Sequence, residues 1–506
     1  MLVGVLATLV FSLPVVQTKL ALYATETLNE EFGTNITIER LHFSPFTLGA
    51  TIKDIYVEDY RQDTLIHIEK LSTSILDLGN MVNGDLEFSE MDVDGLFFNM
   101  KTYKGETETN LDVFVDKLDD GKPRDPGTPP FLMSSSEITI ENSRYRLSDD
   151  NVEKPRILDF KNLEIASTDF EILGPEVSVQ IDALSLTSER GIDVKNLSTR
   201  FKYTKQQMRF DSLAIQTPES KISGLLVFDY NRKDFADFLN KVRISASFKD
   251  AEVAFNEVNT YFNEFGKNRT ALFSTSVSGV LNDLQFNELF LVSDNTGIRG
   301  DFGLRNMFND AEPFKIDAQM ENVTSNYYQL RAILPNILSQ NILPTSFKKF
   351  GQFTIRGDAQ ITESSIDAKI NLNTAIGSSY SDLQMTNIND IDDASYLGFI
   401  SLIDFDLGDF IEDPKFGKTT LDVNVEGRGF IAEYLNTEAI GDIYSITFNG
   451  YEYKDVKVSG IIKEELFDGS LISNDENLKL NFTGLADFSQ EENNFNFIAS
   501  VDYADL

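Results

Sequence analysis

The chain contains no cysteine and no tryptophan among its 506 residues, and it has only 13 prolines and two histidines. The absence of cysteine excludes disulfide bonds, thiolate metal sites and a cysteine nucleophile. Basic residues are also few, because 44 lysines and arginines face 81 aspartates and glutamates, which gives a net charge of −37. Such a charge repels phosphate backbones, so nucleic acid is not an expected partner.

The sequence also lacks the motifs of common catalytic sites. It has neither a G-x-S-x-G nucleophile elbow nor an H-E-x-x-H zinc motif. Residues Gly427 to Ala432 match the spacing of a dinucleotide-binding loop, but the segments after them alternate like antiparallel strands. His42 and His67 alternate with apolar neighbours, which predicts that both lie on the polar face of a strand. We therefore expect no enzyme, no cofactor and no metal site.

What the chain has in abundance is alternation of apolar and polar residues, which begins near residue 34 and continues to the end. Alternation places every second side chain on the same face of a sheet, and the pattern is typical of antiparallel strands with one buried face. Seven of these segments end in apolar-x-Gly, and the glycine allows a strand to bend or bulge. The seven are Ile222–Gly224, Val277–Gly279, Ile298–Gly300, Ile355–Gly357, Val425–Gly427, Val458–Gly460 and Phe482–Gly484. The sequence predicts a mostly β protein built as an elongated, curved antiparallel sheet.

Three segments have helical spacing instead: Asp234–Val242, Glu252–Phe265 and Ser325–Gln340. Pro335 is expected to kink the last of them. We expect these short helices to cap the sheet by packing apolar faces on it.

The N-terminal 16 residues carry no charge. This stretch is shorter than the ~20 residues of a spanning helix, so it predicts the outer part of a transmembrane anchor. A signal-peptide core is the alternative, but the stretch lacks a basic n-region and a clear cleavage site. An amphipathic helix from Gln17 to Phe32 follows directly and stops at Gly33, which favours the anchor. The predicted anchor residues are Leu2, Val3, Val5, Leu6, Leu9, Val10 and Phe11.

These features predict five regions. They are a partial anchor at 1–16, an amphipathic helix at 17–33, a first β unit at 34–116, a Pro/Gly-rich linker at 117–133 and a repeating β region at 134–506. The linker is indicated by four prolines within residues 119–130.

Several structural glycines and apolar positions together carry a resemblance. They are Leu13–Gln17, Leu28–Asn29, Phe32–Gly33, Asn83–Leu86, Leu343–Pro344, Phe350–Gly351, Ile355–Gly357, Phe405–Gly408, Phe416–Gly417, Leu421–Gly427, Phe448–Tyr451 and Leu466–Gly469. In these the chain resembles the N-terminal portion of the translocation and assembly module (TamB) family, within the AsmA-like repeating β-groove group, Bacteroidetes type. The resemblance covers nearly the whole chain, but the anchor is short and the family's C-terminal domain is not in the sequence.

The resemblance implies a long, taco-like β-groove that is anchored in the inner membrane by a single pass and has its bulk in the periplasm. It implies transport of phospholipids toward the outer membrane, with an Omp85-type (TamA-like) partner there. A chaperone for outer-membrane β-barrels and a purely structural envelope spacer stay open as alternatives.

An apolar groove would shelter acyl chains from water without any catalytic residue. A phospholipid carries about 30 methylenes, and exposing them at ~0.8 kcal/mol each costs about 25 kcal/mol. The residues predicted to line the groove alternate with polar ones on their strands. They are Val277, Ile370, Leu372, Val423, Val425, Val456, Val458, Leu478, Leu480, Phe482, Phe495 and Phe497.

Overall fold

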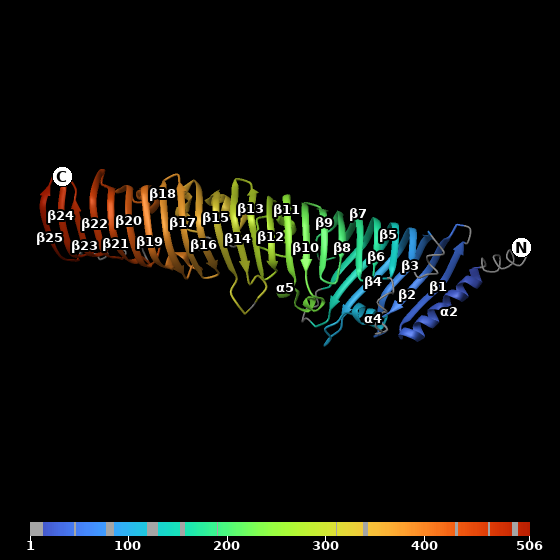
Figure 1. The fold of residues 1–506 in the computed structure, drawn as a ribbon. Helices are drawn as coiled ribbons and strands as arrows, with labels where there is room; N and C mark the ends of the chain where they lie inside the picture. The colour runs from blue at the N-terminus through green and yellow to red at the C-terminus, as the bar shows by residue number, and fades with distance from the viewer. Residues whose placement is uncertain are drawn as a thin grey trace, which may run out of the picture. The chain divides into compact units, whose positions relative to one another are not determined.

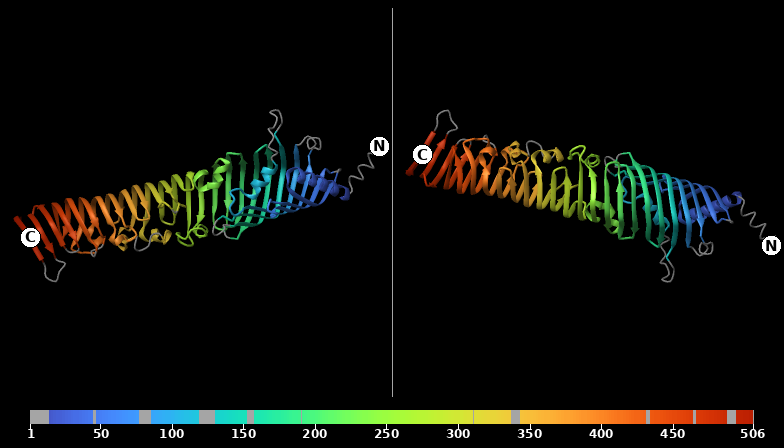
Figure 2. Two further views of the ribbon diagram at one scale, coloured as in Figure 1. Left: turned by 90° about the horizontal axis from the view of Figure 1, so that it is seen from below. Right: turned by 90° about the horizontal axis from the view of Figure 1, so that it is seen from above.

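The computed structural model describes residues 14–44, 47–76, 85–118, 130–151, 157–189, 191–309, 311–336, 343–430, 434–463, 466–487 and 494–505. These residues form 25 strands and a few short helices (Figure 1), which confirms the predicted mostly β, antiparallel class. The chain divides into two compact units, Met1–Ala251 and Glu252–Leu506. Within each unit the strands lie side by side in one layer (Figure 2).

The first unit is a ladder in which each strand from β1 to β10 pairs with the next. Its helices are α2 (Pro14–Phe32), α4 (Asn110–Leu118), η1 (Arg232–Asp237) and α5 (Phe238–Lys241). Its strands are β1 (Asn35–Ser44), β2 (Gly49–Glu58), β3 (Thr64–Ile75), β4 (Leu86–Thr102), β5 (Leu132–Asp149), β6 (Leu158–Leu173), β7 (Glu176–Ser188), β8 (Val194–Tyr203), β9 (Gln207–Gln216) and β10 (Lys221–Asp229). β11 (Arg243–Ala254) runs across the boundary between the units.

One pair in this ladder, β4 with β5, is parallel, whereas the sequence pattern predicted antiparallel pairing throughout. A parallel pair needs a crossover that returns the chain to the same end of the sheet, and alternation within the strands does not report it. The crossover leaves β4 at Thr102, includes α4 and re-enters at Leu132. The boundary between the compact units falls after Ala251, and residues 119–129 of the expected linker lie outside the described residues.

The second unit is an antiparallel ladder in strict chain order from β12 to β25. Its strands are β12 (Thr270–Val280), β13 (Asp283–Ser293), β14 (Thr296–Arg305), β15 (Lys315–Asn326), β16 (Gln352–Thr362), β17 (Ser365–Thr374), β18 (Gly377–Thr386), β19 (Ser395–Asp406), β20 (Phe416–Arg428), β21 (Asn436–Phe448), β22 (Tyr451–Lys463), β23 (Leu466–Asn474), β24 (Leu478–Asp487) and β25 (Asn494–Ala504). Its helices are α6 (Phe255–Val258), α7 (Tyr327–Ile333), η2 (Thr345–Phe350), η3 (Ile391–Asp393) and α8 (Leu407–Ile411).

Two of the predicted helices are shorter than their spacing indicated. Residues 252–254 extend β11, and α6 has only four residues, because the Asn259 side chain ends it. The Asn259 Nδ2 donates to the Phe265 carbonyl oxygen at 2.8 Å, and the Phe265 N–H donates to Asn259 Oδ1 at 3.2 Å, which closes a loop. α7 stops at Ile333, two residues before Pro335, whose ring disfavours a helical conformation in the residue before it.

Among the described residues, no helix is long and apolar enough to cross a bilayer. The predicted anchor residues Leu2, Val3, Val5, Leu6, Leu9, Val10 and Phe11 lie outside the described residues.

At each glycine of the apolar-x-Gly motif, a Cβ atom would lie 2.0 to 2.6 Å from a carbonyl oxygen of the neighbouring strand. Gly300 and Gly357 have φ angles of +150° and +131°, which only glycine adopts readily. A Cβ atom at either would lie 2.0 Å from a carbonyl oxygen of the next strand, that of Gln319 or Lys369. Glycine kinks of this kind introduce curvature into a sheet, which gives a structural reason for the repeated motif.

Candidate functional site

The predicted lining residues fall on one face of the second unit because cross-strand partners share a face. Ile370 of β17 is opposite Ser381 of β18, and Ser381 is opposite Ile400 of β19. Ile400 is in turn opposite Val423 of β20. Val423 is opposite Gly441 of β21, which in turn is opposite Val458 of β22. The other predicted residues join this face by pairing or by alternation along a strand. These are Val277, Leu372, Val425, Val456, Leu478, Leu480, Phe482, Phe495 and Phe497.

One row of cross-strand partners on this face is apolar from β12 to β25. It begins at Val277 and ends at Phe497, both of which the sequence predicted. Between them the row contains alanines, glycines and a few larger apolar residues, and no polar side chain. Its members are Val277, Phe286, Phe302, Ala318, Ala359, Ala368, Leu383, Gly398, Val425, Ala439, Gly460, Gly469, Gly484 and Phe497. We call this set the apolar row.

Two clusters show how the row is packed. Ala318, Ala359 and Ala368 are buried and contact larger residues on either side, among them Ile361 and Ile370. A second cluster contains the buried residues Val423, Val425 and Ala439, with Leu383, Tyr396, Ile400, Leu421, Val458 and Ile462 around them. Every member of both clusters comes from a strand of this one sheet. The small side chains therefore owe their burial to flanking residues, and no helix or second sheet contributes to either cluster.

Helices pack instead along one border of the face. Phe350 of η2 stacks on Phe410 of α8 with ring centroids 5.5 Å apart and meets Phe405 at 6.4 Å. This aromatic group contacts Leu372 and Leu402 at the ends of their strands. The helices η2 and α8 at this border were not predicted; of the three predicted helical segments, only 325–340 contributes here, through Leu330 of α7, and the clusters of the row contain strand residues only.

In the first unit, α2 lies against the edge strand β1. Its Gln17 amide pairs with the backbone of Phe43, and its Asn29 amide pairs with the backbone of Ile36 in the same way. The Thr18 hydroxyl adds a contact of 3.4 Å to the backbone of Leu41. Side-chain amides therefore satisfy backbone groups that an edge strand would otherwise offer to another strand.

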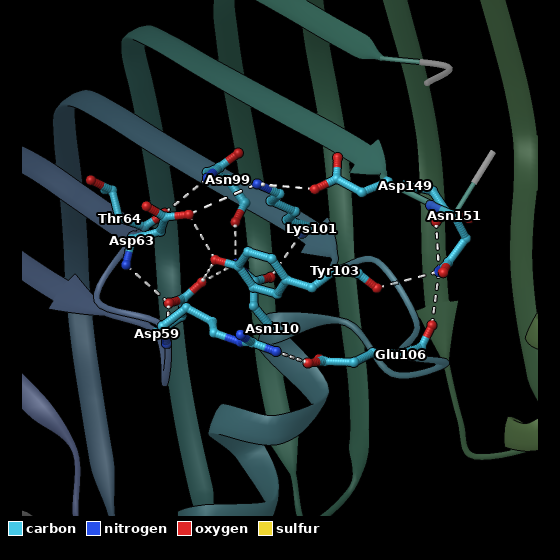
Figure 3. A network of polar contacts seen from close by, with 12 residues as sticks. Asp59, Asp63, Thr64, Asn99, Lys101, Tyr103, Glu106, Asn110, Asp149 and Asn151 are labelled. Carbon is cyan, nitrogen blue, oxygen red and sulfur yellow. Dashed lines mark hydrogen bonds and ion pairs between the residues drawn. The ribbon is translucent and has the colours of Figure 1, made fainter. Parts of the chain in front are cut away.

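A polar network in the first unit joins the β2–β3 turn to the end of β4 and to α4 (Figure 3). The Tyr103 hydroxyl lies 2.6 Å from Asp59 Oδ2 and 2.8 Å from Asp63 Oδ2, and Asn110 Nδ2 donates to Asp59 Oδ2 at 3.1 Å. The Lys101 ammonium lies 4.6 Å from the centre of the Tyr103 ring. Burial is the main cause that raises the pKa of Tyr103, and the two carboxylates raise it further. Because these groups bond to one another, the network ties the β2–β3 turn, the end of β4 and α4 together.

Within the described residues, no group of three His, Asp or Glu side chains is placed to hold a metal ion. Sequence reasoning missed the alanines of the apolar row and the amides of α2; of the glycines in the row, Gly460 and Gly484 were predicted as bend or bulge positions but not as members of one row. Alanines at inward positions of the alternation were a signal for the row, but their alignment depends on register, which alternation does not fix.

Comparison with protein-family models and with curated proteins found no match for this chain.

Proposed function

We propose that the apolar face of the second unit carries the acyl chains of phospholipids between two membranes. The apolar row supports this proposal, because it offers a path from β12 to β25 without a polar side chain. At ~4.8 Å per strand the row is roughly 60 Å long, about twice the ~30 Å hydrocarbon core of a bilayer. A lipid moving along it keeps its chains against hydrocarbon throughout.

The energetic reason is the cost of exposing chains to water, about 25 kcal/mol for about 30 methylenes at ~0.8 kcal/mol each. A uniform apolar row removes much of this cost and also avoids deep traps, since neighbouring positions along it are chemically alike. The small residues of the row, such as Ala359, Ala368 and Gly460, keep side chains out of the path. Such transport breaks no covalent bond, so it requires no catalytic residue.

The resemblance to the AsmA-like repeating β-groove group gives this proposal its cellular setting. In that setting the N-terminal segment anchors the chain in the inner membrane, and the β units lie in the periplasm. The partner at the outer membrane is then a protein of the Omp85 (TamA-like) type.

A photo-crosslinking amino acid at position 458 tests the proposal. Val458 is on the apolar face, opposite Gly441 and Leu471, whereas its neighbour Ser459 is on the other face and exposed. Protein carrying the crosslinker at 458 should form phospholipid adducts detectable by mass spectrometry, and protein carrying it at 459 should form few. Equal labelling at both positions, or none at 458, contradicts the proposal.

Val458→Asp provides a functional test with Ser459→Asp as its matched control. A carboxylate in the path places a charge where acyl chains must pass, and an unpaired charge in an apolar environment is strongly disfavoured. We expect Val458→Asp to lower the phospholipid that co-purifies with the protein, while Ser459→Asp leaves it unchanged.

The chaperone alternative requires a free strand edge that pairs with a client strand. The edge of β1 does not meet this requirement, because Gln17 and Asn29 of α2 bond to its backbone. Proline substitutions in edge strands separate the two functions, since they block strand addition and leave the apolar row intact.

A further inference from the structure

A polar cavity that is largely open to solvent lies at the start of the second unit, beside α7. Its volume is 580 Å³, and it is formed by the segment before β12, the turn between β13 and β14, and one side chain of α7. The lining residues are Lys267, Asn268, Arg269, Asp294, Asn295 and Gln329.

The walls of this cavity are held together by direct bonds. The Gly266 N–H donates to the Ile333 carbonyl oxygen at 2.8 Å, which joins the segment before β12 to α7. The Ser293 hydroxyl donates to the Thr270 carbonyl oxygen at 2.7 Å, and Arg269 forms an ion pair with Asp294. The cavity is therefore formed before any ligand binds, which lowers the conformational cost of binding.

Two polar groups of the cavity are unmatched. The Gln329 Oε1 is buried and has no hydrogen-bond partner in the described part of the chain. An acceptor in that position costs free energy unless a ligand donates to it. Lys267, which also lines the cavity, is exposed to solvent and forms no ion pair among the described residues, although the chain as a whole carries a net charge of −37. The cavity thus offers an unused acceptor beside an unused cation.

The cavity adjoins an apolar cluster on the face described above. Phe255, Ala271 and Ile333 are buried together, with Leu291 and Leu334 against them. Leu291 is opposite Ile298 of β14, so this cluster belongs to the same face as the apolar row. A molecule with a polar head in the cavity can therefore place its apolar part on this face.

We propose that this cavity binds the headgroup of a zwitterionic phospholipid, one whose phosphodiester is linked to a primary amine. Lys267 and Arg269 pair with the phosphate, and the amine donates to Gln329 Oε1 and to the carboxylate of Asp294. The same carboxylate repels a headgroup that carries only negative charge, so the pattern selects the zwitterion. This inference rests on the proposed transport of acyl chains for its biological setting, but its test uses soluble headgroups.

Titration of the purified chain with glycerophosphoethanolamine tests the proposal, with inorganic phosphate and glycerophosphoglycerol as comparison ligands. We expect glycerophosphoethanolamine to bind best, and we expect Lys267→Glu and Gln329→Met each to weaken it about tenfold, the loss of one charge-assisted bond. Lys205→Glu makes the same charge change on an exposed lysine of the first unit and should have no effect.

Each outcome decides a different point. Equal binding of inorganic phosphate identifies a general anion site and overturns the headgroup proposal, as does absence of any effect of the two variants. Unfolding curves check that the Gln329→Met variant folds. We expect it to fold, because the substitution replaces a polar side chain whose Oε1 has no partner by an apolar side chain of similar size. If lipid adducts form at position 458 but glycerophosphoethanolamine does not bind, only the headgroup proposal fails. If the headgroup binds and no adduct forms at 458, only the transport proposal fails.

Discussion

The side-chain amide of Gln17 exchanges two hydrogen bonds with the backbone of Phe43. Its Nε2 donates to the Phe43 carbonyl oxygen at 2.6 Å, and the Phe43 N–H donates to its Oε1 at 2.7 Å. Asn29 repeats this arrangement with Ile36, at 2.9 and 2.8 Å. An amide side chain has the same donor and acceptor as a peptide group, so α2 stands in for a neighbouring strand along β1.

Removing both amides should therefore expose this edge. For the double variant Gln17→Ala/Asn29→Ala we expect a loss of about 2 kcal/mol in the free energy of unfolding, from several lost hydrogen bonds. We also expect concentration-dependent self-association through the uncovered strand. Urea unfolding and sedimentation velocity measure the two effects. Thr27→Ala is the control, because among the described residues the Thr27 hydroxyl donates to the Tyr23 carbonyl oxygen of its own helix and to no group of β1. A double variant that stays monomeric contradicts the protective role of α2.

The close approach of strands at Gly357 predicts a graded series of alanine substitutions. Gly357→Ala combines a φ of +131° with a Cβ 2.0 Å from a carbonyl oxygen, and we expect it to cost about 3 kcal/mol. Gly450→Ala has a φ of +82° but open space around the new Cβ, so we expect about 1 kcal/mol. At Gly297 the space is also open and no positive φ is required, so alanine should be tolerated within about 0.5 kcal/mol. Urea unfolding ranks the three, and a different order argues against crowding as the reason for the motif.

The raised pKa of Tyr103 predicts a pH dependence on the alkaline side. Burial and the nearby Asp59 and Asp63 carboxylates keep this phenol neutral in the folded protein above its ordinary pKa of 10.0. Above pH 10 the unfolded chain ionises this tyrosine and the folded chain does not, so its stabilising contribution is complete below that pH and falls above it. Tyr103→Phe should cost about 1–2 kcal/mol at pH 8, and its difference from the unmodified protein should shrink above about pH 10. Urea unfolding between pH 8 and 11 measures this, and a difference that does not change with pH excludes it.

The ion pair of Arg144 with Asp159 predicts the opposite dependence on the acid side. Arg144 Nε donates to Asp159 Oδ1 at 2.7 Å, and this bond lowers the pKa of the buried Asp159 carboxyl. The contribution is present above the ordinary aspartate pKa and is lost as the pH falls through the lowered value. Asp159→Asn should therefore cost about 1–3 kcal/mol at pH 7 and progressively less below about pH 4. Asp182→Asn, at an exposed carboxylate that accepts a hydrogen bond from Thr168, is the control and should show a smaller change.

Alternation and glycine placement were enough to predict the class of fold and the face to which each inward residue belongs. Ile370 and Leu372, or Val456 and Val458, alternate with polar residues. Successive side chains of a strand point to opposite faces, so the apolar residues share one face and the polar residues share the other. The same local pattern predicted α2, since its sequence has helical spacing and a glycine stop at Gly33. These signals come from a few consecutive residues and do not depend on how distant parts of the chain pack.

The tertiary structure alone decided how the strands align with one another. Whether Ala359 faces Ala368, and whether Val277 and Phe497 end one row, depends on turns and bulges whose effects add along the ladder. The parallel pair β4–β5 and the bonds from α2 to β1 likewise join segments far apart in sequence. Local alternation is the same in every register, so the apolar row came from pairing and not from the order of residues within a strand.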